Sequence, residues 1–319
     1  MGIIDNKQAW VLAKTNAGEI ARVVPVQELW NGYGSLLRIY LNEGEVPSVI
    51  LKEVVLPEGL EQSISHQRKH RSYEVERTWY TQHATRCDED CRVASCFAVK
   101  EDAGRSWMLL EDLAVSGFQP NPYPSAEQAK AGLRWLAHFH SEFLNNDIHD
   151  LWEQGCYWHL DTRQDEYLRM PSGPLKDMAS SFDQLLKSAR YQTLVHGDAK
   201  PPNFCWTSDN HAAAVDFQYV GKGCGIRDVC LFLERSLLRE GCAEVGDPWL
   251  DLYFAYLKEA MEEDGHEGFE ELEREWRQLF CIAWSDYSRF RQGWANTNTL
   301  HPYSREMLKK AELVLRSSP

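Results

Sequence analysis

Residues 193–218 read TLVHGDAKPPNFCWTSDNHAAAVDFQ and hold three side chains that could bind a metal ion or accept a proton. Asp198 and Asn203 are five positions apart, and Asp216 follows Asp198 by eighteen. Mg²⁺ prefers oxygen ligands and is usually held by one or two carboxylates together with substrate phosphates. A carboxylate beside such an ion can also take the proton of a substrate hydroxyl. The segment therefore predicts chemistry on a phosphate group.

Two short apolar runs in this segment predict the strands that position its polar side chains. Leu194 and Val195 precede the sequence HGDAKPPN, in which a glycine and two prolines favour an irregular loop. Residues 212–215 predict a second strand, which ends at Asp216. We expect the two strands to form a hairpin that presents the three polar side chains at its ends.

The first part of the chain predicts an antiparallel sheet. Apolar, β-branched runs at residues 21–30, 35–41 and 48–56 are separated by NGYG and NEGEVP, which are rich in turn-forming residues. Residues 73 to about 84 have the apolar spacing of a helix, and residues 92–99 and 106–110 return to strand character. The basic run HQRKHR at 66–71 precedes this helix, and we interpret it as a solvated or locally functional patch.

The composition changes at residues 116–124, SGFQPNPYP, where three prolines predict a linker. Ser125 and Gln128 then form the pattern of a helix capping box. Helical spacing follows at residues 182–189, 228–239, 249–263, 269–292 and 304–316. The sequence therefore predicts an α+β protein with an antiparallel-sheet N-lobe at 1–115, a linker at 116–124 and a mostly helical C-lobe at 125–319.

Composition and charge limit the classes of partner. The chain has 34 basic and 48 acidic residues and a net charge of −14, which argues against nucleic acid or an anionic membrane as the main partner. A cationic substrate is compatible with this balance. No apolar run approaches the length of a membrane span, no secretion signal is recognisable, and nine cysteines make no disulfide framework. We therefore expect a cytoplasmic protein without a membrane span.

The loop and the second carboxylate together resemble a known superfamily. HGDAKPPN resembles the catalytic loop H-x-D-x-x-x-x-N of protein-kinase-like enzymes, and DFQ resembles their metal-binding motif with Gln in place of Gly. His-Gly-Asp is similar to the loop of aminoglycoside phosphotransferases and choline kinases. The order of NGYGS, VILKEV, YEVERTWY and LLEDL is similar to the ecdysteroid-kinase-like branch. The resemblance covers about residues 20–240 and implies a bilobal, protein-kinase-like fold.

The resemblance implies a role for each polar residue of the loop. Asp198 would be the catalytic base, and Asn203 and Asp216 would ligate Mg²⁺. Lys200 matches a position at which protein kinases place a lysine near the transferring phosphate. Asp228 matches a buried aspartate at a helix start that steadies the catalytic loop.

Further roles are implied for the N-lobe. Lys52 would contact the α- and β-phosphates of ATP and pair with a glutamate of the next helix, for which Glu76 is favoured over Glu74. A turn would cover the phosphates, and a hinge would meet adenine through its backbone. The turn and hinge residues are Gly32, Gly34, Ser35, Glu111 and Leu113.

These roles imply an ATP- and Mg²⁺-dependent phosphotransferase that acts on a small-molecule hydroxyl, such as an amino alcohol, an aminoglycoside or a sterol-like alcohol. The main alternative is a nucleotide-binding pseudokinase or scaffold, which predicts damage to the base or metal positions, and these positions are intact. A protein kinase is disfavoured because only twelve positions separate Asp216 from Asp228, which leaves no room for a long activation loop.

The sequence says less about the acceptor. Six aromatic residues recur at helical spacing and favour a core stripe over a ligand site: Trp276, Phe280, Trp284, Tyr287, Phe290 and Trp294. Aromatic faces attract cations, so part of this stripe, with Asp286 beside it, is an alternative site for an ammonium group. A second candidate wall consists of Tyr157, Trp158, Asp161 and Asp165.

Overall fold

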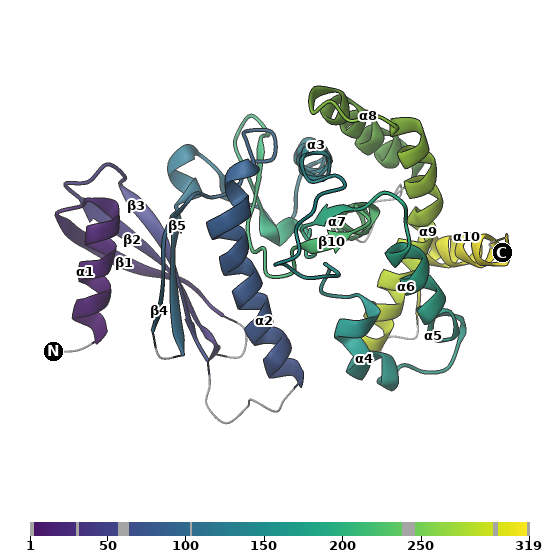
Figure 1. Cartoon of the computed structure of the whole chain (residues 1–319), viewed down its shortest axis with the longest axis horizontal. Helices are drawn as coiled ribbons and strands as arrows, with labels where there is room; N and C mark the ends of the chain where they lie inside the picture. The colour runs from purple at the N-terminus through teal and green to yellow at the C-terminus, as the bar shows by residue number, and fades with distance from the viewer. Residues whose placement is uncertain are drawn as a thin grey trace.

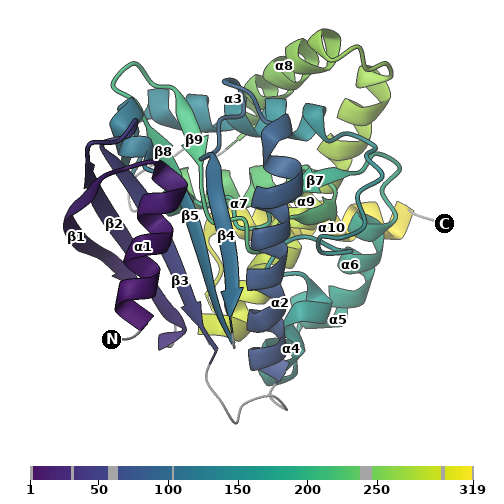
Figure 2. The ribbon, with the colours of Figure 1, turned by 60° about the vertical axis from the view of Figure 1, so that its left-hand side comes forward.

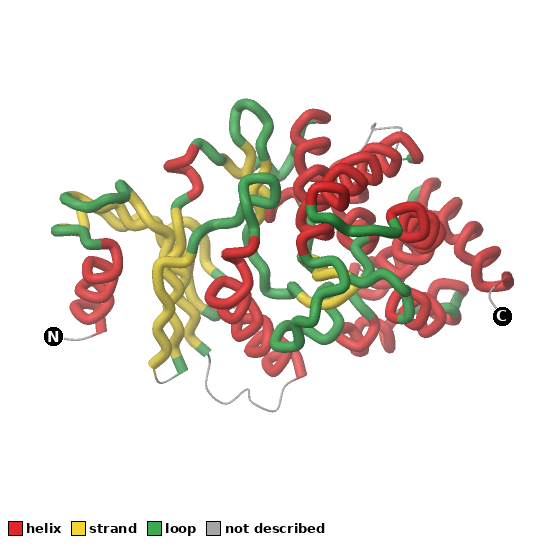
Figure 3. Tube along the Cα trace, turned by 45° about the horizontal axis from the view of Figure 1, so that its top comes forward, coloured by secondary structure: helices red, strands yellow, loops and turns green. Residues whose placement is uncertain are grey.

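The computed structural model describes residues 3–29, 32–56, 64–102, 104–237, 246–295 and 299–317. Strands gather in an N-terminal sheet at one end of the molecule, and helices fill the other end (Figures 1 and 3). This arrangement is the predicted α+β, bilobal fold with an antiparallel-sheet N-lobe and a mostly helical C-lobe. The two chain termini lie at opposite ends of the long axis (Figure 1).

The N-terminal sheet has five antiparallel strands in the order β1-β2-β3-β5-β4. Their bounds are Glu19–Glu28 for β1, Gly34–Asn42 for β2, Ser48–Val55 for β3, Cys96–Asp102 for β4 and Arg105–Glu111 for β5. Strand β3 is central and places Lys52 between Leu36 of β2 and Met108 of β5. The side chain of Lys52 is therefore held in the middle of the sheet rather than at an edge.

A helix lies on each side of this sheet, as Figure 1 shows nearly edge-on, and Figure 2 shows α1 lying over one face. Helix α1 (Ile3–Thr15), which the sequence analysis did not predict, packs Val11 against Val49 and Leu51 of β3. Successive residues of a strand point to opposite faces, so Lys52 and Val54 face the other way, toward helix α2 (Ile64–Thr78). The alternation on β3 thus separates an apolar face from a face that carries a buried charge.

Helix α2 begins at Ile64 and not at residue 73, so the prediction that the basic run 66–71 precedes the helix is wrong. The first part of α2 is polar because much of it borders a cavity and not a core, and it therefore lacks an apolar period. A π-helical turn (Trp79–His83) and a 3₁₀ turn (Ala84–Arg86) complete the predicted helical stretch.

Small sheets of the C-terminal part differ from the predicted hairpin. Strand β7 (Thr193–Val195) pairs with β10 (Gly221–Gly223), and β9 (Ala212–Ala214) pairs with β8 (Phe204–Trp206). A hairpin of residues 193–195 with 212–215 is therefore wrong, because the chain forms β8 directly after the loop and this strand takes the place beside β9. Within the expected linker, β6 (Gln119–Pro120) pairs with β8.

The helices of the C-terminal part surround these strands. Ser125 caps α3 (Ala126–Glu142) through both bonds of the predicted capping box with Gln128. The other helices are α4 (Gln164–Arg169), α5 (Pro174–Asp177), α6 (Ala179–Lys187), α7 (Ile226–Leu237), α8 (Asp247–Glu263), α9 (Phe269–Ala295) and α10 (Pro302–Ser317). The five predicted helices all occur, although residues 238–239 lie outside the described ranges. None of the helices in these ranges is long and apolar enough to cross a membrane.

Candidate active site

The loop after β7 is fixed by a buried histidine and a buried aspartate. The backbone N–H groups of His196 and Gly197 donate to the two carboxylate oxygens of Asp228, at 2.5 and 3.0 Å. Asp228 lies in the first turn of α7, is fully buried, and also meets Nε2 of His140 at 3.3 Å. Both oxygens of Asp228 accept from the loop, and Oδ2 also contacts His140 of α3, so this carboxylate of α7 joins the loop to α3 and α7.

His196 in turn orients the next residue. Its Nε2 donates to the carbonyl of Val215 at 3.0 Å, which leaves Nδ1 to accept the backbone N–H of Asp198 at 3.2 Å. Gly197 has φ +79°, and a Cβ there would lie 2.1 Å from the carbonyl oxygen of Tyr219. Backbone geometry therefore requires the glycine of the His-Gly-Asp sequence, since a side chain at this position would clash with Tyr219.

Asp198 is buried at the end of this turn and accepts two side-chain bonds on one oxygen. Lys200 Nζ donates to Oδ2 at 2.7 Å and Asn203 Nδ2 donates to Oδ2 at 3.0 Å. The other oxygen, Oδ1, has no hydrogen-bond partner among the described residues. Burial raises the pKa of the Asp198 carboxyl, and the charge of Lys200 only partly offsets this effect. A buried, half-satisfied carboxylate with a raised pKa is suited to accept a proton.

Asp216 lies in the left-handed region at φ +67°, a conformation that non-glycine residues rarely adopt. The next residue, Phe217, is buried and stacks on Trp79 with ring centroids 4.7 Å apart, which anchors the strained turn. Burial opposes ionisation of Asp216, but the charges of Lys52, Lys200 and Lys69 outweigh it and hold the pKa of this carboxyl below its usual range. Asp216 is therefore an anion at neutral pH.

Lys52 connects the sheet to this carboxylate. Its Nζ lies 2.6 and 2.7 Å from the two oxygens of Glu76 and 3.7 Å from Oδ1 of Asp216. Burial works against the charge of Lys52, yet the carboxylates of Glu76 and Asp216 raise its pKa, so the ammonium persists. The alternative partner, Glu74, lies outside this contact and pairs with His70 and Arg71 on the surface of α2.

The predicted phosphate turn lies between β1 and β2. Gly34 has φ +138°, and a Cβ on it would lie 1.9 Å from the carbonyl oxygen of Glu53, so the turn requires a glycine. Gly32 also has a positive φ, of +73°, and Ser35 follows in β2 opposite Glu53. Residue 31 of the NGYGS motif lies outside the described residues.

The predicted hinge follows β5. Glu111 accepts two bonds from Arg92, at 2.6 and 2.7 Å, and a third from the backbone of Ser95. Leu113 begins a 3₁₀ turn and is buried in the main core. Neither side chain borders the cavity described next, so any contact of this segment with a ligand would be made by its backbone.

A cavity of about 710 Å³ brings together Asp198, Lys200 and Asp216. Lys69 of α2 also lines it and donates to Oε1 of Gln218 at 2.7 Å, while Ser72 donates to the same oxygen at 3.3 Å. Lys69 was not among the predicted site residues, because the basic run at 66–71 was interpreted as a patch that precedes the helix. Gln218 in the DFQ motif was the available signal for Lys69. Its side-chain oxygen needs a hydrogen-bond donor, whereas a glycine at this position would not.

Only part of the aromatic stripe reaches this cavity. Trp276 and Trp284 are fully buried in the core, whereas Tyr287, Phe290 and Trp294 line the cavity. Asp286 is fully buried and bonds Arg289 at 2.6 Å, so it is already neutralised and is not an ammonium site.

The second candidate wall divides in the same way. Tyr157 and Asp165 border the cavity, Trp158 is fully buried, and Asp161 pairs with Lys187 on the surface.

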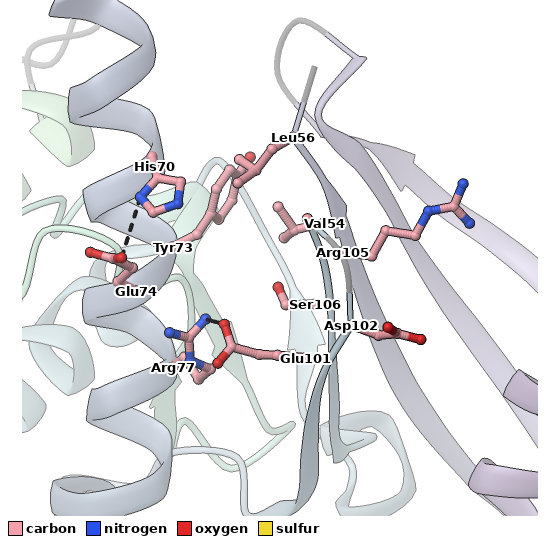
Figure 4. Close-up of a pocket in the computed structure, with 11 residues that line it drawn as sticks. Val54, Leu56, His70, Tyr73, Glu74, Arg77, Glu101, Asp102, Arg105 and Ser106 are labelled. Atoms are coloured by element: carbon pink, nitrogen blue, oxygen red, sulfur yellow. Dashed lines mark ion pairs between the residues drawn. The ribbon is translucent and has the colours of Figure 1, made fainter. Parts of the chain in front are cut away.

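A separate cavity of about 380 Å³ lies between α2 and the sheet (Figure 4). His70, Tyr73 and Glu74 enter it from the helix, and Val54 and Ser106 enter it from β3 and β5. Arg77 of the helix meets Glu101 of β4 at 2.5 Å across it. Four of its charged or titratable groups are paired, His70 with Glu74 and Arg77 with Glu101, and none of the residues of the loop after β7 lines it.

The oxygen atoms at the active site fit a hard metal ion. Oδ1 of Asp216 is buried and accepts no hydrogen bond from the described residues. Asn203 donates its Nδ2 to Asp198. The backbone N–H of Val215 donates to the backbone carbonyl of Asn203 at 2.9 Å, which holds Asn203 near Asp216. The described ranges hold no cluster of three or more His, Cys, Asp or Glu side chains suited to a metal. The oxygen atoms of Asp216 and Asn203 suit Mg²⁺, whose other ligands would be phosphate and water.

The comparison with known proteins agrees with this geometry. A model of the phosphotransferase enzyme family matches residues 37–292, which is most of the chain. The chain belongs to this family. A search of curated protein sequences gave no match. The matched region contains the loop, Asp216, and the pair formed by Lys52 and Glu76, whereas the turn with Gly32, Gly34 and Ser35 precedes it.

Solved structures show the same fold at low identity. An amicoumacin kinase in complex with AMP-PNP and Ca²⁺ is 14% identical, with a TM-score of 0.54 and 99% of this chain and 94% of that chain covered. A macrolide 2′-phosphotransferase from Brachybacterium faecium is 12% identical, with a TM-score of 0.52 and 99% of both chains covered. A microcompartment-associated aminopropanol kinase is 14% identical, with a TM-score of 0.52 and 98% and 95% covered.

Proposed function

We propose that this member of the phosphotransferase enzyme family transfers the γ-phosphate of ATP to a hydroxyl of a small molecule, in a Mg²⁺-dependent reaction. One observation carries the proposal: the buried pair of Lys52 and Glu76 contacts Asp216, and Asp216 shares a cavity of about 710 Å³ with Asp198. A phosphate-binding lysine, an anchored carboxylate and a candidate base are the parts that phosphoryl transfer requires.

Asp198 would act as the base. Its free Oδ1 would accept the proton of the acceptor hydroxyl while the acceptor oxygen forms a bond to the γ-phosphorus. The bond from that phosphorus to the bridging oxygen breaks, and ADP leaves with the electron pair. Lys200 and Asn203 hold the other carboxylate oxygen, so Oδ1 is kept in one orientation toward the cavity.

The other residues would bind and orient ATP. Lys52, fixed by Glu76, would donate to the α- and β-phosphates, and Lys200 would lie beside the transferring phosphate. When bound, Mg²⁺ neutralises the phosphate oxygens, and Asn203 and Asp216 would hold it. The covering turn would be formed by Gly32, Gly34 and Ser35, and the backbone from Glu111 to Leu113 would meet adenine.

The class of acceptor follows from the size of the cavity and from the neighbours. The printed names of the structural neighbours include a macrolide phosphotransferase, an aminopropanol kinase and an amicoumacin kinase. These names support a small molecule as the acceptor. Amino alcohols, aminoglycosides and sterol-like alcohols are the first acceptors to assay.

Replacing Asp198 by Asn tests the proposal. ATP-dependent phosphorylation of the acceptor, measured by coupled ADP release over a panel of choline, aminoglycosides, sugars, macrolides and steroids, should fall about 10²–10⁴-fold in the variant because the proton acceptor is lost. ATP binding with Mg²⁺, measured by thermal shift, should persist. Asp209→Asn, at an exposed site in the same segment, is the matched control.

Three outcomes would contradict parts of the proposal. Near-normal turnover in Asp198→Asn would remove Asp198 as the base. A folded protein that shows no thermal shift at saturating ATP and Mg²⁺ would exclude nucleotide binding. Binding of ATP without turnover of any acceptor would favour the alternative of a nucleotide-binding pseudokinase.

A further inference from the structure

The cavity that holds Asp198 has the opposite charge balance from the whole chain. Seven Lys and Arg side chains line it against four Asp and Glu side chains, whereas the chain as a whole carries a net charge of −14. Lys69 and Lys200 lie near the catalytic carboxylates, where the phosphates of ATP would meet them. The remaining cations are arginines, and they need a separate explanation.

Carboxylates neutralise only two of these five arginines. Arg163 meets Glu166 at 3.5 Å, and Arg291 contacts Glu234. The other three form no ion pair with the described residues: Arg68, Arg169 and Arg235. An arginine that lines a cavity without a carboxylate partner is a site for an anionic ligand, because guanidinium binds carboxylate and phosphate through paired donors.

Arg68 is the most constrained of the unpaired arginines. It is half-buried on α2, and its Nη1 donates to the carbonyl of Thr162 at 2.5 Å. Burial lowers the pKa of its guanidinium and the like charge of Arg163 lowers it further, while Tyr219, Glu166 and Asp165 oppose this only in part. Two guanidinium groups that border one cavity repel each other, and a bound anion would relieve that repulsion.

Arg163 is held by an aromatic wall. Its guanidinium carbon lies 5.5, 5.5 and 5.4 Å from the ring centroids of Tyr157, Phe290 and Trp294. Its Nε donates to the carbonyl of Tyr157 at 2.6 Å. The three aromatic rings therefore already contact a cation of the protein itself, Arg163. They are less suited to bind an ammonium group of a substrate.

The acidic residues of the outer cavity do not reverse this balance. Glu166 is buried, and Oε1 meets Arg163 at 3.5 Å, so this one carboxylate serves two arginines, since its charge also acts on Arg68. Asp165 is exposed to solvent, where its charge is screened. Asp286, the residue first considered for an ammonium group, is buried against Arg289 and Arg227 and lies outside the cavity lining.

We propose that the acceptor of this phosphotransferase is an anionic hydroxy compound, whose carboxylate or phosphate group binds Arg68 while its apolar body lies against Tyr287, Phe290 and Trp294 and its hydroxyl meets Asp198. The inference rests on the proposed function, because it concerns what that reaction phosphorylates. The acidic composition of the whole chain is compatible with a cationic acceptor such as an amino alcohol. The basic lining of this cavity instead favours a negatively charged acceptor.

Binding of matched probes tests the charge directly. Four hydroxymethyl-arenes of one shape differ only in their second group: 4-(hydroxymethyl)benzoate, the corresponding phenylphosphonate, the benzamide and the benzylamine. Affinities would be measured by calorimetry with AMP-PNP and Mg²⁺ present and absent. We expect one of the anions to bind about tenfold or more tightly than the neutral amide, and the benzylamine to bind most weakly. The stronger anion identifies the headgroup.

Variants of Arg68 link the preference to this residue. Arg68→Gln should weaken the preferred anion about tenfold and leave the benzamide nearly unchanged, and Arg68→Lys should retain part of the preference because it keeps the charge. Arg274→Gln is the control, since Arg274 is exposed on α9 and outside the cavity lining. The melting temperature of each variant would confirm that it is folded.

The possible results separate the inference from the function on which it rests. Tighter binding of the benzylamine, equal binding of all four probes, no binding of any probe, or an anion preference that survives in Arg68→Gln would each overturn the anionic acceptor. These results would leave ATP binding and Asp198-dependent turnover in place. Loss of the nucleotide thermal shift in the unaltered protein would instead overturn the phosphotransferase proposal.

Discussion

The charged groups at the two ends of the cavity are paired in different ways. The proposed catalytic end lies at Asp198 and Asp216, and the proposed acceptor end lies at Arg68. At the catalytic end, Lys52 meets Glu76 and Asp216, and Asp198 meets Lys200, so opposite charges are already within hydrogen-bond or ion-pair reach. At the acceptor end, Arg68 has only a carbonyl oxygen as its hydrogen-bond partner among the described residues. The charges of the first region are paired without a ligand, whereas in our proposal Arg68 in the second region is paired only when an anionic ligand binds.

Helix α2 joins the two regions. Glu76 holds Lys52 through a buried ion pair, and Lys69, two turns earlier, bonds Gln218 directly after the DF pair. Arg68 lies beside Lys69 and faces the same cavity. A shift of this helix would therefore move the contact of Glu76 with Lys52 and the cavity lining at Arg68 and Lys69 together.

Among the variants that compare the two ends of the cavity, the largest effect is expected for Asp216. Asp216→Asn removes the anion that Lys52 approaches and an oxygen donor for Mg²⁺, so kcat should fall about 10²–10³-fold, as for other preorganised electrostatic groups. The measurement is single-turnover phosphorylation at saturating ATP. If the variant kept more than a tenth of the activity, the reaction would not depend on the charge of Asp216. The proposed difference between the two ends of the cavity would then be wrong.

The next effect concerns stability. The carboxylate of Asp228 accepts the buried backbone N–H groups of His196 and Gly197. In Asp228→Asn, the new NH₂ group would face one of these N–H groups, which would then lack an acceptor. Such a loss costs about 3 kcal/mol of unfolding free energy. Urea denaturation would measure it. Arg68→Gln should cost much less, because Arg68 has no buried ion pair to lose, and an equal cost for both variants would show that the acceptor end is as preorganised as the catalytic end.

The smallest effect concerns pH. Burial lowers the pKa of Lys69 to about 8, although Asp216, Glu76 and Asp198 oppose this and Lys52 adds to it. Lys69 therefore carries its charge below about pH 8 and loses it as the pH rises. The kcat/KM for ATP should fall about tenfold through this range, the value of one charge-assisted bond to phosphate. In Lys69→Gln the loss should be present at every pH.

Lys309→Gln, at an exposed site on α10, is the control for this pH profile. An unchanged alkaline limb in Lys69→Gln would show that another group titrates there, and Lys69 would then belong with the structural contacts of Gln218 rather than with the phosphates.

Several parts of the fold were predictable because they depend on local pattern. The strands of the N-terminal sheet, the capping box at Ser125 and the five later helices each follow from spacing within one segment. Helix α1 and the start of α2 were not, since α2 borders a cavity along its polar first part and offers no apolar period there. Strand β7 was predicted, but its partner was wrong because pairing depends on which strand reaches it in space.

The sequence by itself determined which groups are present for the chemistry. The spacing of Asp198, Asn203 and Asp216 and the glycine at 197 are set within one short segment, where backbone sterics act between near neighbours. Only the tertiary structure decided that Glu76 and not Glu74 meets Lys52, because the phase of α2 against β3 selects one face of the helix. It also placed Arg68 and Arg163 beside one cavity, since charges from distant segments meet only when the elements dock.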